Sequence, residues 1–135
     1  MIKHRIMLVE DELITALDIQ RMLEKVGYSV TATISSGEEA VERVSQINPD
    51  LIIMDIFLSD DMDGIEATAL IERKVDIPVI FLTANADTTT IKRADKLKHY
   101  GYLLKPIKQG DLNSIISTAL QRHEIETNAK NSIRH

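Results

Sequence analysis

The chain has 135 residues, of which 44% are hydrophobic and 27% are charged, a composition that is typical of one globular domain and excludes a disordered chain. Asp and Glu outnumber Lys and Arg by 21 to 16, and the net charge of −5 argues against binding nucleic acid or anionic membranes by charge alone. The absence of cysteine excludes a disulfide framework and a thiolate metal site, and no apolar run is long enough for a membrane span or a signal peptide, so we expect a cytoplasmic protein.

Short apolar runs recur along the chain and predict strands. Each is only a few residues long and rich in Val, Ile and Leu, or in β-branched residues in the second run, which suits strands buried on both faces of a parallel sheet. We expect strands at residues 6–9, 28–34, 51–54, 79–82 and 102–104.

Between these runs, apolar residues recur at the spacing of one helix face. Gly27 and Pro49 are expected to end the first two helices, because glycine accepts a left-handed C-terminal position and proline cannot continue a helix. The third stripe includes Ala69, and the fourth has the fewest apolar anchors. We expect helices over residues 16–26, 40–47, 65–71, 90–97 and 112–120.

Five strands alternating with five helices predict an α/β fold: an open, doubly wound parallel sheet with helices on both faces. A closed (β/α)₈ barrel would need about 250 residues. We expect residues 1–123 to form this domain. The polar segment 124–135 is expected to be an extension of the last helix or a linker stub.

Polar side chains follow the predicted strands, at the edge where open parallel sheets place their ligands. Glu10 and Asp11 follow the first strand, Asp55 the third, Thr83 the fourth and Lys105 the fifth. Taken singly, each has an ordinary explanation: Asp11 and Thr83 as helix caps, Asp55 as a turn residue, Lys105 as a solvated lysine.

Together, these residues indicate chemistry. Three crowded carboxylates raise one another's pKa unless a cation neutralises them, and oxygen ligands are those that Mg²⁺ prefers. A lysine and a hydroxyl beside such a metal, with no glycine-rich loop, suit one small anion such as a phosphoryl group.

Four motifs, in matching order and spacing, resemble those of the receiver domain of two-component response regulators. They are VEDE at residues 9–12, IIMDI at 52–56, FLTA at 81–84 and YLLKP at 102–106. The resemblance extends over residues 5–123 and implies the flavodoxin-like, CheY-like fold with strand order 2-1-3-4-5.

The resemblance implies a role for each matching position. Asp55 matches the phosphoacceptor, with Thr83 and Lys105 as the catalytic groups that contact the phosphoryl oxygens. Thr83 and Tyr102 match the switch pair, and Pro106 follows the lysine where the family has a cis peptide. The Mg²⁺ ligands would be Glu10, Asp11, Asp55 and the backbone carbonyl of Phe57.

The implied function is a single-domain response regulator that is switched by phosphorylation and does not turn over an external substrate. Its phosphodonor would be the phosphohistidine of a sensor histidine kinase or a phosphotransfer protein. No basic tail or recognition-helix pair suggests direct DNA binding. The resemblance also implies a partner surface, formed by the fourth helix, the fifth strand and the fifth helix. It would bind an acidic partner or form a homodimer; the alternative is that its lysines are simply solvated. This face includes Lys92, Lys96, Lys98, Tyr102 and Lys108.

Two features depart from the family pattern, in the loop after Asp55. Ser59 stands where many receivers have proline, and Gly64 lies one residue later than usual, so we expect an altered loop shape. Tyr100 is expected to pack, because Tyr102 has the spacing of the switch residue. The histidines show no metal-site spacing and are expected at the surface: His4, His99, His123 and His135.

Three alternative functions were weighed. A haloacid-dehalogenase-type phosphatase needs a second Asp two residues after the first, where this chain has Phe57. A flavodoxin-like cofactor carrier needs a phosphate-binding loop after the first strand, but residues 10–12 are all acidic and would repel a flavin phosphate. A degenerate receiver would not be expected to keep the acidic residues together with Thr83 and Lys105.

Overall fold

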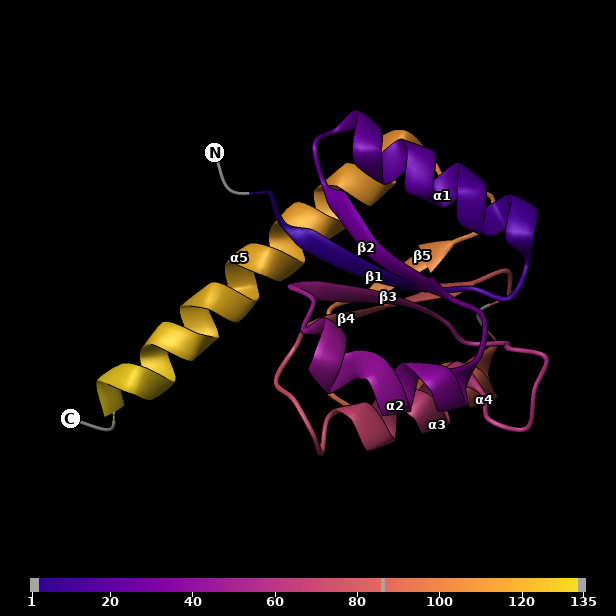
Figure 1. Ribbon diagram of the computed structural model, residues 1–135. Coiled ribbons are helices and arrows are strands. Elements are labelled where there is room, and N and C mark those ends of the chain that lie inside the picture. The colour runs from indigo at the N-terminus through magenta and orange to yellow at the C-terminus, as the bar shows by residue number, and fades with distance from the viewer. Residues whose placement is uncertain (1–2, 86, 134–135) are drawn as a thin grey trace.

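The computed structural model describes residues 3–85 and 87–133. Five parallel strands form one sheet in the order β2-β1-β3-β4-β5, which confirms the predicted fold class (Figure 1). The strand bounds lie within one residue of those predicted: β1 Arg5–Val9, β2 Ser29–Ile34, β3 Leu51–Asp55, β4 Val79–Thr83 and β5 Tyr102–Leu104.

Five helices cover the two faces of the sheet. Helices α1 and α5 lie on one face, and α2, α3 and α4 lie on the other (Figure 1). Their bounds are α1 Leu13–Lys25, α2 Gly37–Ile47, α3 Gly64–Ile71, α4 Thr88–Ala94 and α5 Gln109–Ile133.

The central strands are buried on both sides, which explains why their sequences are continuously apolar. In β1, Ile6 and Leu8 pack with α1 and α5, whereas Met7 and Val9 pack with the helices of the opposite face. Successive side chains of a strand point to opposite faces, so each central strand supplies both cores.

The first two helices end where the sequence indicates. Gly27 has a φ of +96° and its N–H bonds the carbonyl of Glu24, while Asn48 adopts φ +49° just before Pro49. Val26, predicted as part of the apolar stripe, is instead the C-cap of α1 and is exposed.

Two helices differ from prediction for local reasons. Helix α4 begins at Thr88 because the Asp87 side chain accepts the N–H of Thr90, and it ends at Ala94 instead of residue 97. In α3 the fully buried alanine is Ala67, and the predicted Ala69 is only partly buried.

Helix α5 runs for 25 residues, well past its predicted apolar stripe. Residues 124–133, expected as a helix extension or a linker, continue this helix beyond the end of the sheet (Figure 1). No helix in the described part of the chain is long and apolar enough to cross a membrane.

Candidate functional site

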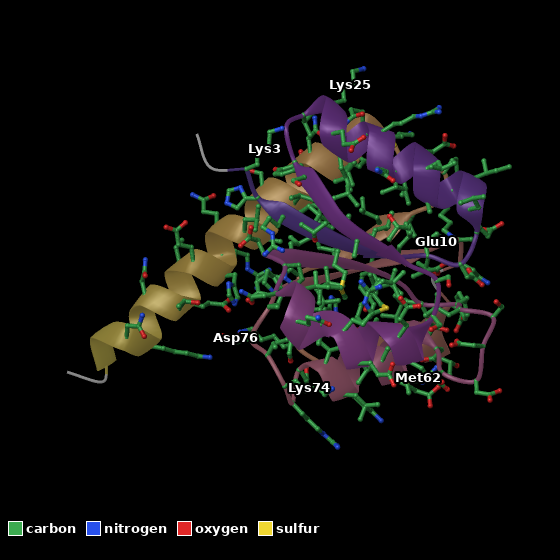
Figure 2. All side chains as sticks on the ribbon, viewed as in Figure 1. Lys3, Glu10, Lys25, Met62, Lys74 and Asp76 are labelled. Carbon is green, nitrogen blue, oxygen red and sulfur yellow. The ribbon has the colours of Figure 1, made fainter. Side chains whose placement is uncertain are left out.

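The carboxyl ends of β1, β3 and β5 bring an acidic cluster and a lysine together. Asp55 is the last residue of β3, is only 3% exposed, and accepts the N–H of Phe57 at 3.1 Å. Glu10 follows β1 at the same edge of the sheet (Figure 2). Carboxylate oxygens of Glu10, Asp11 and Asp55 all lie within 4.8 Å of one another.

Glu10 is the most buried acid of this cluster, at 2% exposed. Burial, and next the neighbouring Asp55 carboxylate, raise the pKa of Glu10 to about 7. One of its oxygens accepts the N–H of Glu12 at 3.1 Å, while the other, Oε2, is buried and lies 3.0 Å from the Lys105 ammonium. A buried carboxylate oxygen that already faces a positive charge is suited to a cation.

Lys105 balances part of this negative charge. Its Nζ lies 3.1 Å from Asp55 Oδ2, 3.0 Å from Glu10 Oε2 and 3.6 Å from Glu12 Oε1. Burial alone would lower the pKa of Lys105, but the Glu10 and Asp55 carboxylates outweigh it and raise that pKa. The alternative of a solvated lysine is therefore wrong. The peptide bond between Lys105 and Pro106 is cis, as the resemblance implies.

Asp11 points toward the loop after β3. Its Oδ2 accepts the N–H of Ser59 at 3.0 Å, so it does not cap α1, whose N-cap position is Glu12 without a side-chain bond. Burial would raise the pKa of Asp11, but the bonds from Ser59 prevail and lower it. Ser59, where many receivers have proline, thus supplies a free N–H that orients Asp11.

The donor set fits a hard divalent cation. Three carboxylates, two from the loop after β1 and one from the end of β3, are the oxygen ligands that Mg²⁺ takes. Among the described residues this is the single cluster of metal-ligating side chains. The predicted contribution of the Phe57 backbone carbonyl stays a prediction; its N–H bonds Asp55.

Thr83 ends β4 at the same edge, and its hydroxyl bonds the adjacent loop. It donates to the carbonyl of Asn85 at 2.8 Å and accepts that residue's N–H at 3.2 Å. The N-cap of α4 is Asp87, so the alternative of Thr83 as a helix cap is wrong.

Tyr102 begins β5 and bonds α4. Its hydroxyl donates to Asp95 Oδ1 at 2.6 Å, and its ring stacks on Phe81 with centroids 6.1 Å apart. Burial first, and then the Asp95 carboxylate, raise the pKa of Tyr102. His99 bonds the same Asp95 oxygen at 2.8 Å.

The prediction of four surface histidines is wrong in part. The side chains of His99 and His123 are 12% and 21% exposed and lie beside Asp95 and Asp76 respectively. His4 is exposed, and His135 lies outside the described residues. Both rings pack against aromatic side chains: His99 against Phe81 and Tyr102, and His123 against Tyr100.

Gly64 is a site residue whose role the sequence analysis missed. A Cβ at this position would overlap the carbonyl oxygen of Asp55 and lie 2.8 Å from its carbonyl carbon. The Gly64 N–H also bonds the carbonyl of Ile56 at 2.8 Å, so the start of α3 is pressed against the end of β3. The sequence signal that could have indicated this role is the position of Gly64 at the end of the acidic loop that follows Asp55.

The chain matches a family model described as the response regulator receiver domain over residues 6–117. Among curated relatives, the transcriptional regulatory protein PdtaR of Mycobacterium tuberculosis is 34% identical over 121 residues, which are 90% of this chain and 58% of PdtaR. The DNA-binding response regulator MtrA of Mycolicibacterium smegmatis is 29% identical, covering 92% of this chain and 54% of MtrA. The chain therefore spans little more than half the length of these relatives.

Solved structures agree with the family match. The signal receiver domain of a modulated diguanylate cyclase from Desulfovibrio desulfuricans G20 superposes with a TM-score of 0.88 at 32% identity, covering 93% of this chain and 99% of that one. The anti-anti-sigma factor PhyR from Bartonella quintana gives 0.80 at 32% identity, over 96% of this chain and 52% of that one. Because the family match covers most of the chain and the sheet order and the sequence agree with it, the chain belongs to the family of response regulator receiver domains.

Proposed function

We propose that this protein is a phosphorylation-controlled switch of the cytoplasm whose phosphoacceptor is Asp55. The Asp55 carboxylate attacks the phosphorus of a phosphohistidine on a sensor histidine kinase or phosphotransfer protein. An O–P bond forms, the N–P bond breaks, and the imidazole leaves with the electron pair. The observation that carries the proposal is the buried Asp55 carboxylate, which lies 3.1 Å from the Lys105 ammonium and within 4.8 Å of carboxylate oxygens of Glu10 and Asp11.

Position and charge supply the catalysis, because phosphoryl transfer leaves little covalent chemistry for the protein. Glu10, Asp11 and Asp55 would hold Mg²⁺, with the Phe57 carbonyl as a further ligand, and the metal would offset the repulsion between a carboxylate and an anionic phosphoryl group. Lys105, already 3.1 Å from Asp55, pairs with a phosphoryl oxygen.

The same observations support a switch over a multiple-turnover phosphatase. A phosphatase of this architecture would need an acid two residues after Asp55, and that position is Phe57, which is 49% exposed at the rim. Receiver domains as a family are signalling switches. We therefore assign no external substrate to the site.

The output would follow from the new charge. An acyl phosphate adds almost two negative charges at one point, which favours a state in which the Thr83 hydroxyl leaves Asn85 for a phosphoryl oxygen. Tyr102 would then turn inward and leave Asp95. The exposed lysines beside them, Lys92, Lys96 and Lys108, favour an acidic effector surface or a second copy as the partner. We propose no direct contact of this domain with DNA.

The experiment is phosphorylation with acetyl phosphate, followed by intact-protein mass spectrometry. We expect one phosphoryl group per chain in the presence of Mg²⁺, none with a chelator, and loss of the group in alkali or hydroxylamine, as for an acyl phosphate. Asp55→Asn should abolish the adduct, and Asp61→Asn, an exposed acid of the neighbouring loop, should leave it unchanged. An adduct that persists in Asp55→Asn, or that forms equally well without Mg²⁺, would contradict the proposal.

A further inference from the structure

We propose that residues 95–102, which connect α4 to β5, mechanically couple the Tyr102 switch to the part of α5 beyond the sheet. We call residues 121–133 the α5 extension. This inference rests on the proposed function for its signal, but its structural core can be tested without phosphorylation. The contacts involved join residues 95–102 to Tyr102 on one side and to the α5 extension on the other.

The α5 extension faces the domain with polar side chains. The buried stripe of Leu112, Ile116 and Ala119 is continued at helical spacing by His123, Glu126 and Lys130. His123 Nε2 lies 3.2 Å and Lys130 Nζ 3.9 Å from the Asp76 carboxylate, in the loop before β4. The extension is therefore docked by polar contacts where the first part of α5 is docked by apolar packing.

Glu126 is the centre of the contacts with residues 95–102. It accepts the hydroxyl of Tyr100 at 2.7 Å and pairs with Lys98 Nζ at 3.0 Å. Arg122, from the preceding turn of α5, lies over the Tyr100 ring at 5.0 Å. Two residues of the segment thus bond one carboxylate of the extension.

His99, between these two residues, faces the switch. Its Nδ1 accepts the N–H of Gly101 at 3.1 Å, so Nε2 carries the proton that is donated to Asp95 at 2.8 Å. Asp95 accepts the Tyr102 hydroxyl through the same oxygen. Consecutive side chains of the segment therefore alternate between the switch on one side and the extension on the other.

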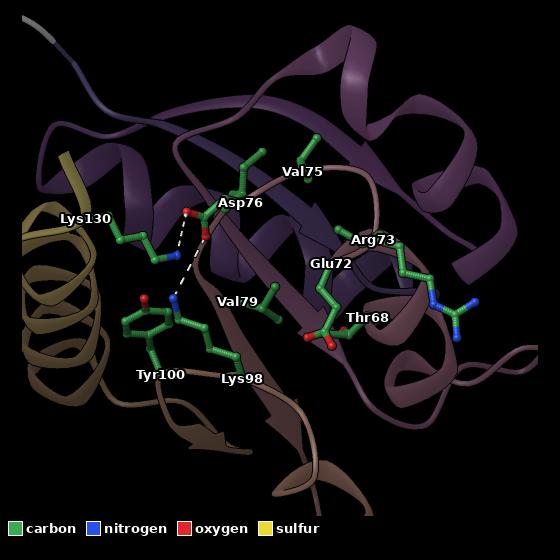
Figure 3. A pocket seen from close by; sticks show the side chains of 11 residues that line it. Thr68, Glu72, Arg73, Val75, Asp76, Val79, Lys98, Tyr100 and Lys130 are labelled. Atoms are coloured by element: carbon green, nitrogen blue, oxygen red, sulfur yellow. Dashed lines mark ion pairs between the residues drawn. The ribbon is translucent and has the colours of Figure 1, made fainter. Parts of the chain in front are cut away.

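A pocket lies beside the contacts of the extension. It has a volume of about 410 Å³ and is lined by α3, the loop before β4, the segment 95–102 and Lys130 of α5, and the side chains of Asp76, Lys98 and Lys130 meet across it (Figure 3). Asp76 is 57% and Lys98 48% exposed. Exposed pairs of this kind contribute little to stability, so a small shift of the segment is enough to separate them.

The contacts of residues 95–102 with the switch and their contacts with the α5 extension form in the same arrangement of this segment. When Tyr102 leaves Asp95, His99 loses part of its support, and Lys98 and Tyr100 move with it relative to Glu126. Phosphorylation of Asp55 should therefore loosen the α5 extension. Because coupling between two sites is reciprocal, loosening the extension should in turn favour phosphorylation.

Hydrogen exchange of the full chain tests the coupling. We expect Glu126→Gln to raise exchange at residues 121–133 and to raise the initial rate of Asp55 phosphorylation by acetyl phosphate and Mg²⁺ a few-fold. The matched control is Glu124→Gln, which makes the same charge change on an exposed residue of the same helix and should alter neither. Acetyl phosphate should raise exchange at residues 121–133 in the wild type and leave it unchanged in Asp55→Asn.

A second variant separates this inference from the proposed function. Asp95→Ala, without any phosphodonor, should raise exchange at residues 121–133 although the side-chain bonds of Asp95 go to His99 and Tyr102, outside the extension. Asp87→Ala, which removes the cap at the other end of α4, should not. Unchanged exchange in Asp95→Ala overturns the coupling even where Asp55 is phosphorylated normally. Increased exchange supports it even where Asp55 is not phosphorylated, and that failure would count against the proposed function alone.

Discussion

Asp55 is held in place by its backbone as much as by its side-chain partners. Gly64, at the start of α3, lies against the carbonyl group of Asp55 so closely that no side chain fits between them. A displaced Asp55 backbone would move the carboxylate relative to Lys105 and Glu10, which approach it from other elements. The position of the Asp55 carboxylate therefore depends on the glycine at position 64.

We predict that Gly64→Ala lowers the free energy of unfolding by about 3 kcal/mol or more, because the new methyl group must push β3 and α3 apart. Chemical denaturation measures this change. Gly110→Ala is the matched control, since a Cβ there meets nothing within 4 Å, and its stability should stay within about 0.5 kcal/mol of the wild type. Equal denaturation midpoints for the two variants would contradict the close approach.

Glu10 gives a prediction about pH. Its pKa rises from 4.5 to about 7 in the fold, so the fold favours its protonated form. The stabilisation from this group is therefore complete below pH 4.5 and is lost as the pH rises through about 7. In metal-free protein, Glu10→Gln should remove this fall in stability across that range, whereas Glu42→Gln, an exposed acid of α2, should keep it.

Denaturation curves at several pH values, recorded with a chelator, measure the difference between the two variants. Magnesium adds a second readout, because a cation that binds the Glu10 carboxylate must displace its proton. Calorimetric titration should show more protons released per bound Mg²⁺ at pH 6 than at pH 8. Proton release that does not depend on pH would contradict the raised pKa.

At the scale of elements, helix ends fix the loops around the site. The acidic loop after β3 is closed by a capping box at α3, in which Asp63 accepts the Glu66 N–H at 2.9 Å and the Glu66 side chain accepts the Asp63 N–H at 3.2 Å. Asp63 also pairs with Arg93 of α4 at 2.8 Å. This cap holds Gly64 against β3, and the pair with Arg93 joins the loop to α4, whose C-cap is Asp95.

We predict that Asp63→Ala lowers the free energy of unfolding by about 1 kcal/mol, the usual cost of losing an N-cap. It should also slow phosphorylation of Asp55, because the loop that carries Phe57 and Ser59 becomes less ordered. Asp61→Ala, from the exposed part of the same loop, should do neither. Denaturation and the acetyl phosphate assay test both effects, and identical results for the two variants would argue against the cap.

At the scale of the whole molecule, stability comes from two apolar cores, one on each face of the sheet. Helix α5 contributes to one core only through its first half, where Leu112, Ile116 and Ala119 are buried. Leu120 also packs against this core, and beyond it the contacts of α5 with the domain are mainly hydrogen bonds and pairs of charged side chains. One helix therefore combines a permanently packed half with a half that is held by weaker pairs.

Two isoleucines of α5 test this division. Ile116 is fully buried and Ile125 is 61% exposed. We predict that Ile116→Ala lowers the free energy of unfolding by about 2–5 kcal/mol, because it leaves a cavity between α5 and the sheet. Ile125→Ala should change it by about 0.5 kcal/mol at most. A large loss of stability in Ile125→Ala would mean that the extension is packed far more tightly than its polar contacts indicate.

Strands, helices and the residues at the strand ends could be predicted from the sequence, since apolar runs and helical spacing are local properties. The parallel topology then places Asp11, Asp55 and Lys105 at one edge, and the motifs around them specify the family. Helix α4 was predicted less well because Asp87, three residues before Thr90, sets its start through a side-chain bond.

What the tertiary structure alone decided are side-chain and backbone contacts that no pattern of apolar spacing predicts. The closeness of Gly64 to the Asp55 backbone, the bond from the Ser59 N–H to Asp11, and the shared Asp95 oxygen of His99 and Tyr102 depend on distances that no local pattern encodes. The α5 extension is the clearest case. Its polar sequence is compatible with solvent on all sides, and only the fold places Asp76, Lys98 and Tyr100 where His123 and Glu126 can reach them.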